Sequence, residues 1–177
     1  MARPGRINRL APVNVTPPAP LTVGATSIAF ALLNADVGFH LASTHPEAIA
    51  YLQANTGAGS AESATADFLF LRGDDTPDAL QNAPLGVPAY PEGGATAVVM
   101  VEALGRSSAQ GGLALKLTGP GIEGRETVCI TGLSAAHLEL RQARNIEFPL
   151  GLDFMFVTAD GQITCLPRTT KVEWTAL

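Results

Sequence analysis

The sequence predicts an α/β fold, in which a single domain has a mixed β-sheet flanked by helices and a late antiparallel hairpin. Three observations predict it. The 177 residues suffice for one domain with a sizeable core. Helical and strand patterns alternate in the first half of the chain. Near the end, the apolar runs LDFMFVT and QITCL flank ADGQ, which is typical of a hairpin turn.

The N-terminal segment predicts an extended arm. Four prolines fall within LAPVNVTPPAP, residues 10–20. Proline is excluded from helix interiors because it lacks an N–H group and clashes with the preceding turn. We therefore expect a proline-rich arm over residues 1–23 and a single α/β domain over residues 24–177.

Two helices are predicted in the first half of that domain. The largely apolar run 24–38 predicts the first helix, with Thr26 or Ser27 as its N-cap. The second helix begins in THPEAIA, where Thr44 and Glu47 have the spacing of a capping box. We expect it to end at the glycine of ANTG.

The remaining elements follow from shorter patterns. Residues 57–65 predict a small-residue loop, and 74–81 a brief helix capped by Thr76. Residues 134–144 predict an amphipathic helix capped by Ser134. Strands are expected at 39–41, 67–71, 94–104, 113–118 and 125–130. The third of these runs is rich in β-branched residues and is expected to be buried on both faces.

The composition restricts the classes of function. Charged residues make up only 15% of the chain, against roughly 25% in typical soluble domains, which favours a surface partly covered by a partner. The net charge is −5 and no run of Lys or Arg is present, so nucleic-acid binding is not expected. No apolar run reaches the roughly 18–20 residues of a membrane span, and the N-terminus lacks the apolar core of a signal peptide. We therefore expect a cytoplasmic protein without membrane association.

The cysteines and histidines predict no metal site. Cys129 and Cys165 are isolated, which indicates two small buried side chains in a reducing compartment. A disulfide between them is the less favoured alternative. His40, His45 and His137 share no spacing typical of metal ligands.

The segment LTGPGIEG, residues 117–124, contains the glycine spacing of a dinucleotide-binding loop. That loop must open a helix whose N-terminus receives the pyrophosphate, whereas RETVCI follows here and predicts a strand. We therefore interpret the segment as a tight turn between strands, in which Gly119 and Gly121 allow positive φ. An anion-binding role stays open as an alternative, formed by these backbone N–H groups with Arg125.

A second candidate anion site lies in the sequence PRTTK. The guanidinium of Arg168 beside the hydroxyls of Thr169 and Thr170 suits a phosphate or phosphonate oxyanion. The favoured alternative is that Arg168 pairs with a carboxylate of the same chain. Asp153, at the start of an apolar strand, is expected to organise polar groups by hydrogen bonding, with acid–base chemistry or the orientation of an arginine as further roles.

Several ordered motifs give the sequence a family resemblance. They are MARPGR, GATSIAFALLNADVGFHL, PEGGATAVVMVEAL, LTGPGIEG and FPLGLDFMFVTADGQITCLPRTTKVEW. Together they resemble the PhnH family, a subunit of the bacterial carbon–phosphorus lyase system, over nearly the whole chain. The resemblance implies a cytoplasmic complex with subunits G, I and J, and a homodimer when the chain is free. It also implies a fold similar to the large domain of pyridoxal-phosphate-dependent transferases, without the cofactor lysine.

The resemblance implies a role in phosphonate catabolism. Members of the family support formation of ribose 1-methylphosphonate 5-triphosphate from ATP and methylphosphonate, with release of adenine. Family members have a further, usually helical segment ahead of MARPGR, and the sequence as printed begins inside that motif. In that motif, Arg3 and Arg6 are candidates for partner contacts. The alternative, to which we give equal weight, is that both arginines lie in a terminus that is exposed to solvent.

Two functions are therefore expected for this chain. The first is an accessory interaction subunit of this transferase and lyase machinery, without a catalytic centre of its own. No cofactor is expected, because neither Lys116 nor Lys171 lies on a loop near an acidic partner for pyridoxal phosphate. The alternative is a subunit that contributes phosphate-binding or phosphonate-binding residues. It predicts that Arg125, Arg168 and Asp153 converge on one pocket.

Overall fold

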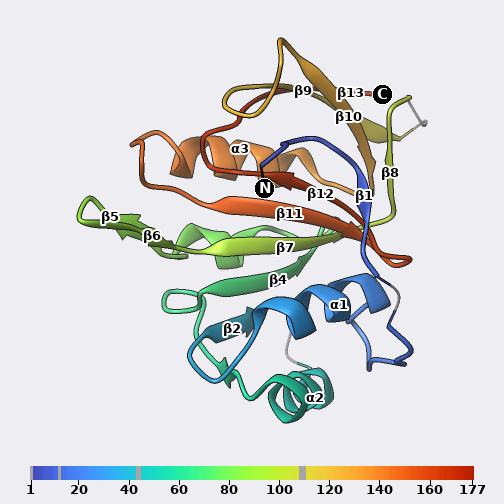
Figure 1. Cartoon of the computed structure of the whole chain (residues 1–177), viewed down its shortest axis with the longest axis vertical. Helices are drawn as coiled ribbons and strands as arrows, with labels where there is room; N and C mark the ends of the chain where they lie inside the picture. Colours follow the sequence, from blue (N-terminus) through green and yellow to red (C-terminus); the bar gives the residue numbers. More distant parts are fainter. Residues whose placement is uncertain (1, 12, 43–44, 108–110) are drawn as a thin grey trace.

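The structure is a computed structural model that describes residues 2–11, 13–42, 45–107 and 111–177 (Figure 1). Its helices are α1 (Val23–Leu32), α2 (Pro46–Thr56), α3 (Ala135–Arg144) and the 3-10 helix η1 (Asp78–Gln81). Its strands are β1 (Asn8–Arg9), β2 (Gly38–Leu41), β3 (Gly59–Ser60), β4 (Phe68–Arg72), β5 (Leu85–Val87), β6 (Tyr90–Gly94), β7 (Thr96–Val101), β8 (Ala103–Gly105), β9 (Gly112–Thr118), β10 (Glu126–Thr131), β11 (Asp153–Thr158), β12 (Gln162–Leu166) and β13 (Lys171–Ala176). None of the helices described is long and apolar enough to cross a membrane.

A seven-stranded mixed sheet forms the centre of the fold, in the order β1-β12-β11-β7-β4-β2-β3. The strands from β11 to β3 are parallel to one another, whereas β12 and β1 are antiparallel to their neighbours. The β11–β12 pair places Phe154 opposite Leu166 across a turn at ADGQ. The predicted α/β class, the mixed sheet and the late hairpin are therefore confirmed.

A second sheet and a projecting hairpin were not predicted. Strands β13, β9, β10 and β8 form an antiparallel sheet in that order, and β5 pairs with β6 (Figure 1). The segments that became β5, β6 and β13 contain glycine, proline, charged residues or isolated apolar residues. Strands β5 and β6 lack the sustained alternation that identifies a strand from sequence. Strand β13, by contrast, alternates polar and apolar residues in KVEWTA, so this strand was predictable although its pairing with β9 was not.

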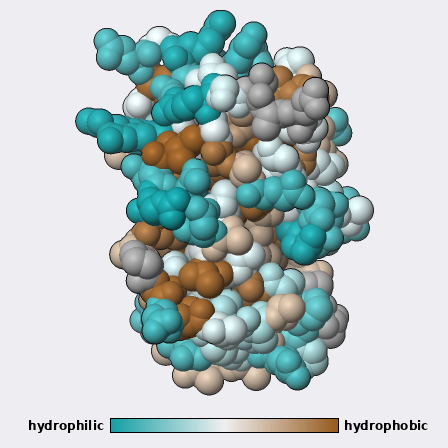
Figure 2. Space-filling model, turned by 90° about the vertical axis from the view of Figure 1, so that its right-hand side faces the viewer, coloured by the Kyte–Doolittle hydropathy of each residue, from teal (hydrophilic) through white to brown (hydrophobic). Residues whose placement is uncertain are grey.

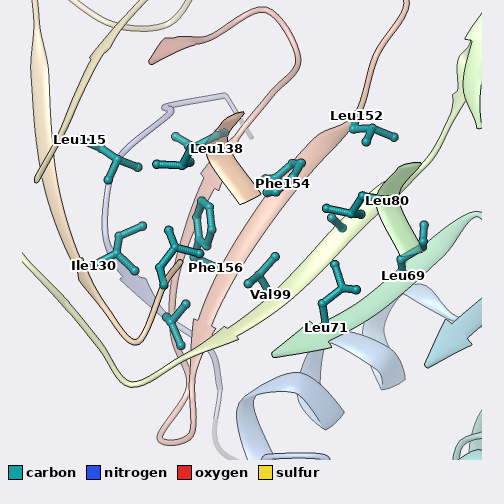
Figure 3. Close-up of a cluster of buried hydrophobic side chains, with 14 of the residues drawn as sticks. Leu69, Leu71, Leu80, Val99, Leu115, Ile130, Leu138, Leu152, Phe154 and Phe156 are labelled. Carbon is teal, nitrogen blue, oxygen red and sulfur yellow. The ribbon is translucent and has the colours of Figure 1, made fainter. Parts of the chain in front are cut away.

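The central sheet buries both of its faces, as expected for a run such as β7. One face packs on α1 and α2 through Phe39, Phe70, Val98, Met100 and Val157. The other face packs on α3 and the second sheet, and Figure 3 shows this cluster, with labels on Leu69, Leu71, Leu80, Val99, Leu115, Ile130, Leu138, Leu152, Phe154 and Phe156. Successive side chains of one strand enter opposite clusters because a strand alternates its faces.

The expected caps of the first helix are wrong. Helix α1 begins at Val23, and the side chain of Thr22 accepts a hydrogen bond from the Ala25 N–H at 3.2 Å. Thr26 is buried within the helix, and the hydroxyl of Ser27 donates to the Val23 carbonyl at 2.8 Å. Thr22 takes the cap because its backbone is extended and directly precedes the first turn.

The first helix is also shorter than expected, and ends at Leu32 rather than at residue 38. Leu33 is extended, and the Asn34 side chain accepts a hydrogen bond from the Asp36 N–H at 2.8 Å. This local turn competes with helix continuation, as asparagine side chains commonly do.

The second helix lies where it was expected, whereas the short helix η1 covers only Asp78–Gln81 of the expected 74–81. Not all of the expected caps are present. Gly57 ends α2 with φ +76°, as expected for a left-handed stop. Thr44 lies outside the described residues, and His45 occupies the N-cap position without a side-chain cap. The hydroxyl of Thr76 donates to the Asp78 carboxylate at 2.8 Å, so its expected role as cap of η1 is wrong. Within the expected loop 57–65, Gly59–Ser60 forms the short strand β3.

The N-terminal segment contributes to the sheet before the first helix begins. Asn8 and Arg9 form the edge strand β1 against β12. The prediction of an amphipathic third helix is confirmed, since Ser134 caps α3 by accepting from the Ala136 N–H at 3.4 Å. Helix α3 lies between the central sheet and the second sheet, and this position creates the site described next (Figure 1).

Candidate functional site

A cavity with a volume of about 590 Å³ lies beside α3. The end of α3 and the following loop form one wall, and the turn from Pro167 to Thr170 with the start of β13 forms the other. It is lined by Pro120, Leu138, Arg141, Gln142, Asn145, Ile146, Phe148, Arg168, Thr169, Thr170, Lys171, Val172 and Trp174. A volume of this size falls within the range of roughly 300–1,000 Å³ that is typical of small-molecule sites.

Arg141 is the buried cation of this cavity, with only 4% of the residue exposed. Its Nη1 donates to the Thr170 carbonyl at 3.2 Å, and its Nη2 donates to the Pro167 and Thr170 carbonyls at 2.6 and 3.2 Å. The guanidinium carbon also lies 5.8 Å from the ring centroid of Phe154. Burial lowers the pKa of Arg141 to about 10, partly offset by the charge of Asp153, so the side chain stays cationic at neutral pH.

Two polar groups at this cavity have no partner among the described residues. They are the Nε of Arg141 and the hydroxyl of Thr170, both of which are buried. A buried donor left without an acceptor costs about 1–3 kcal/mol, so such groups are rare unless water, an ion or a ligand satisfies them.

Arg168 also lines the cavity, but its guanidinium is directed at internal acceptors. Its Nη2 lies 2.7 Å from an Asp153 carboxylate oxygen, and its backbone N–H donates to the same side chain at 2.6 Å. Its Nη1 donates to the Pro91 carbonyl at 2.6 Å, and its Nη2 to the Gly94 carbonyl at 3.3 Å. The arginine therefore joins β11 to strand β6 of the β5–β6 hairpin. Its pairing with Asp153 is the intrachain carboxylate pairing favoured from sequence.

The glycine segment 117–124 forms the turn between β9 and β10, as predicted. Gly119 and Gly121 have φ of +132° and +82°. A Cβ at Gly119 would lie 3.0 Å from the Thr169 carbonyl oxygen. Both positions therefore require glycine, and the turn packs against the wall of the cavity.

The other site residues expected from sequence lie apart. Arg125 is exposed in the β9–β10 connection and is not among the residues that line the cavity, so it does not converge with Arg168 and Asp153. Arg3 and Arg6 are exposed in a turn in which the Arg6 N–H donates to the Arg3 carbonyl at 3.3 Å. This N-terminal turn is also outside the cavity lining.

The histidines, cysteines and lysines singled out from sequence were expected to form no metal or cofactor site. Within the described ranges no group of three or more His, Cys, Asp or Glu residues could hold a metal ion. Cys129 and Cys165 are free thiols, as favoured from sequence, and burial raises the pKa of Cys165. Lys116 is exposed on β9, whereas Lys171 is exposed at the mouth of the cavity.

Sequence reasoning missed Arg141 and Trp174. Arg141 lies three and four residues after Leu138 and His137, which are the other buried members of α3. An arginine on the apolar face of an amphipathic helix was therefore a signal available in the sequence. Trp174 also had a signal, because polar and apolar residues alternate in KVEWTA and place Val172 and Trp174 on one face of a strand.

Comparisons with known proteins agree on one family. The model of the family described as "Bacterial phosphonate metabolism protein (PhnH)" matches residues 1–173. The chain is 35% identical over 178 residues to the alpha-D-ribose 1-methylphosphonate 5-triphosphate synthase subunit PhnH of Rhizobium meliloti (strain 1021), covering 97% of this chain and 84% of the relative. It is 34% identical over 116 residues to the protein HtxG of Stutzerimonas stutzeri, named as a candidate C–P lyase subunit, covering 66% of this chain and 55% of that relative.

Proposed function

The chain belongs to the PhnH family of bacterial phosphonate metabolism proteins, and we propose from this premise that it is a subunit of a carbon–phosphorus lyase system. The similarity to a subunit of alpha-D-ribose 1-methylphosphonate 5-triphosphate synthase along 97% of the chain carries this proposal. The proposed role is to support formation of that compound from ATP and methylphosphonate in the cytoplasm.

The form of this role that we favour is an accessory interaction subunit without a catalytic centre of its own. Its proposed partners are the G, I and J subunits, and a second copy of the chain when it is free. The predominantly parallel central sheet supports the further proposal that the fold is similar to the large domain of pyridoxal-phosphate-dependent transferases.

An exposed apolar surface supports the role as an interaction subunit. Val87 and Tyr90 on the β5–β6 hairpin are 54% and 67% exposed, and Ile146 and Phe148 on the loop after α3 are 77% and 76% exposed. The base of the hairpin and this loop are adjacent, because Leu85 and Ile146 line one cavity of about 230 Å³. Large apolar side chains that are exposed on two neighbouring segments suit a surface that a partner covers.

The opposite end of the molecule provides a contrast. Figure 1 shows the β5–β6 hairpin projecting on the left, and Figure 2 shows the right-hand side of that view. On the face in Figure 2, hydrophobic residues form separate brown patches divided by hydrophilic residues. The exposed apolar side chains of the hairpin and of the loop after α3 make these two segments the surface that we propose for subunit contact.

Co-purification tests the proposed function. The tagged chain is co-expressed with the G, I and J subunits of its host, and native mass spectrometry weighs the eluted complex. We expect a stoichiometric complex that Phe148→Asp weakens. Leu177→Asp is the matched control, because Leu177 is 42% exposed at the C-terminus. Recovery of the wild-type chain alone, or only with itself, would contradict the proposal.

A second candidate function is that the chain contributes phosphate-binding or phosphonate-binding residues to the transferase site. The observation in its favour is that Arg168, Thr169 and Thr170 line one cavity together with Arg141 and Lys171. Arg168 is already paired with Asp153, so the other cations would carry the binding. Titration of the purified chain and of the complex with ATP, followed by the fluorescence of the single tryptophan Trp174, tests this candidate, and the absence of a saturable response in both contradicts it.

A further inference from the structure

The cavity beside α3 is continuous with the exposed apolar surface that we propose for subunit contact. Ile146 and Phe148 are 77% and 76% exposed, and both also line this cavity. Ile146 borders the cavity of about 230 Å³ at the base of the β5–β6 hairpin as well. A partner that covers these two side chains is therefore placed beside the opening of the cavity.

The cavity carries positive charge in a chain that is acidic overall. The chain has 16 acidic residues against 11 Lys and Arg. The lining nonetheless contains Arg141, Arg168 and Lys171, and it contains no Asp or Glu. Arg168 is paired with Asp153, whereas no ion pair joins Arg141 or Lys171 to a carboxylate of the described residues. Two positive charges therefore remain uncompensated beside the apolar surface.

Two buried donors of this cavity have no acceptor among the described residues. They are the Nε of Arg141 and the hydroxyl of Thr170, which belong to residues that are 4% and 3% exposed. A carboxylate only accepts hydrogen bonds and carries the opposite charge, so one acidic side chain supplies both what the donors lack and what the cations lack. Water would satisfy the donors but would leave the charge uncompensated.

The rest of the lining suits the apolar neighbours of such a carboxylate. Leu138, Val172 and Trp174 border the cavity together with Phe148. Tryptophan and arginine are enriched among the few residues that dominate the affinity of protein interfaces, where they lie in well-packed pockets that exclude water. The volume of about 590 Å³ also exceeds that of one carboxylate, which favours a segment of chain as the occupant.

We propose that this cavity receives an acidic segment of a partner subunit. One Asp or Glu carboxylate of that segment lies at Arg141 and Lys171, and its apolar neighbours pack on Trp174 and Phe148. This inference rests on the proposed role as an interaction subunit and deepens it by stating the chemistry of the partner. It attributes the cations of the cavity to a protein contact, and not to the phosphate contact of the second candidate function.

The competing explanation is that Arg141 only holds the turn at Pro167 and Thr170. Substitution of Arg141 would disturb this turn under either explanation. Lys171 distinguishes them, because it is exposed and makes no ion pair with the described residues. Lys116, the other lysine of the chain, is exposed on β9 outside the cavity and is the matched control.

Chemical labelling of the two lysines tests the inference within one chain. The free chain and its purified complex with the G, I and J subunits are acetylated under limiting conditions, and mass spectrometry measures the acetylation of each lysine. We expect Lys171 to lose its reactivity in the complex and Lys116 to keep it. Dilution of each complex, followed by native mass spectrometry, gives its Kd. Lys171→Gln should raise this Kd by roughly tenfold, which is the loss of about one charge-assisted contact, and Lys116→Gln should leave it unchanged.

The outcomes separate this inference from the proposed function. A complex in which Lys171 stays as reactive as in the free chain overturns the docking site and leaves the subunit role intact. An unchanged Kd for Lys171→Gln, or an equal rise for Lys171→Gln and Lys116→Gln, overturns the acidic contact, because binding would then not depend on the charge at this cavity. Failure to form any complex contradicts the subunit role and this inference together. Protection of Lys171 by ATP in the free chain, without protection in the complex, overturns the docking site in favour of the second candidate function.

Discussion

Loss of the ion pair between Arg168 and Asp153 gives the sharpest test of how the candidate site is built. The two side chains are 13% and 18% exposed, and five side-chain hydrogen bonds of Arg168 reach Asp153, Pro91 and Gly94. Arg168→Met keeps much of the packing volume but removes every one of these donors. It leaves the Asp153 carboxylate largely buried with only the backbone N–H of residue 168 as a partner.

The expected cost follows from that burial. Removing one member of a buried pair typically destabilises by about 3–5 kcal/mol, because an uncompensated charge remains. Partial exposure places this pair near the lower value, so we expect about 3 kcal/mol for Arg168→Met and a similar cost for Asp153→Asn. At roughly 2–4 °C per kcal/mol for a chain of this size, the Tm falls by about 6–12 °C.

The double variant measures the coupling. Arg168→Met combined with Asp153→Asn leaves no unpaired charge, so we expect about 3–4 kcal/mol rather than the sum of the single losses. Arg9→Met is the control, since Arg9 pairs with Asp160 at 2.7 Å with side chains that are 61% and 53% exposed. Breaking this exposed pair should cost less than about 1 kcal/mol.

Urea and thermal denaturation followed by circular dichroism provide the free energies of unfolding. ATP titration of each folded variant by tryptophan fluorescence provides the affinities. The structural role of Arg168 would be refuted if Arg168→Met cost no more than Arg9→Met yet abolished the ATP response. Arg168 would then contact the ligand, as one of the two expectations from sequence held.

Two further predictions concern stability. Burial lowers the pKa of His137 below its usual value near 6.5, so the unfolded chain binds a proton below that pH more readily than the folded chain. Stability is therefore complete above about pH 6.5 and falls as the pH is lowered, and His137→Leu should reduce this slope in Tm measurements between pH 7.5 and 5. A Cβ at Gly24 would overlap the Thr158 carbonyl oxygen, so Gly24→Ala should cost roughly 1–3 kcal/mol or more. Gly59→Ala, which meets nothing within 4 Å, should stay within about 0.5 kcal/mol in the same urea titration, and an equal loss in both variants would contradict the packing argument.

The elements that the sequence predicted well are those with strong local patterns. Apolar runs long enough to be buried identified β4, β7 and β11, and the period of α3 identified its buried face. The cap of α1 was misplaced because Thr22, Thr26 and Ser27 all have cap chemistry, and only the path of the preceding backbone decides among them. Strand β13 was not predicted although polar and apolar residues alternate in KVEWTA. Its pairing with β9, more than 50 positions away, could not be inferred from this local pattern.

The candidate site divides in the same way. The sequence identified the PRTTK segment and the glycine turn as candidate anion-binding segments. The PRTTK segment lines the cavity, and the glycine turn packs against that segment. It did not identify which arginine pairs with Asp153 and which lies buried against the carbonyls beside the cavity. Arg168 and Arg141 are both arginines near that segment, and only the location of Asp153 and of the Pro167 and Thr170 carbonyls distinguishes their roles.

The sequence by itself determined the family, the α/β class and the local elements, because these depend on ordered motifs and on periodic burial along the chain. The tertiary structure alone decided the second sheet, the pairing of Arg168 with Asp153 and the cationic cavity at Arg141. The physical reason is that charge and hydrogen-bonding capacity are consumed by neighbours in space. Which polar groups remain available for a ligand is fixed only after β11, α3 and the turn before β13 have packed together.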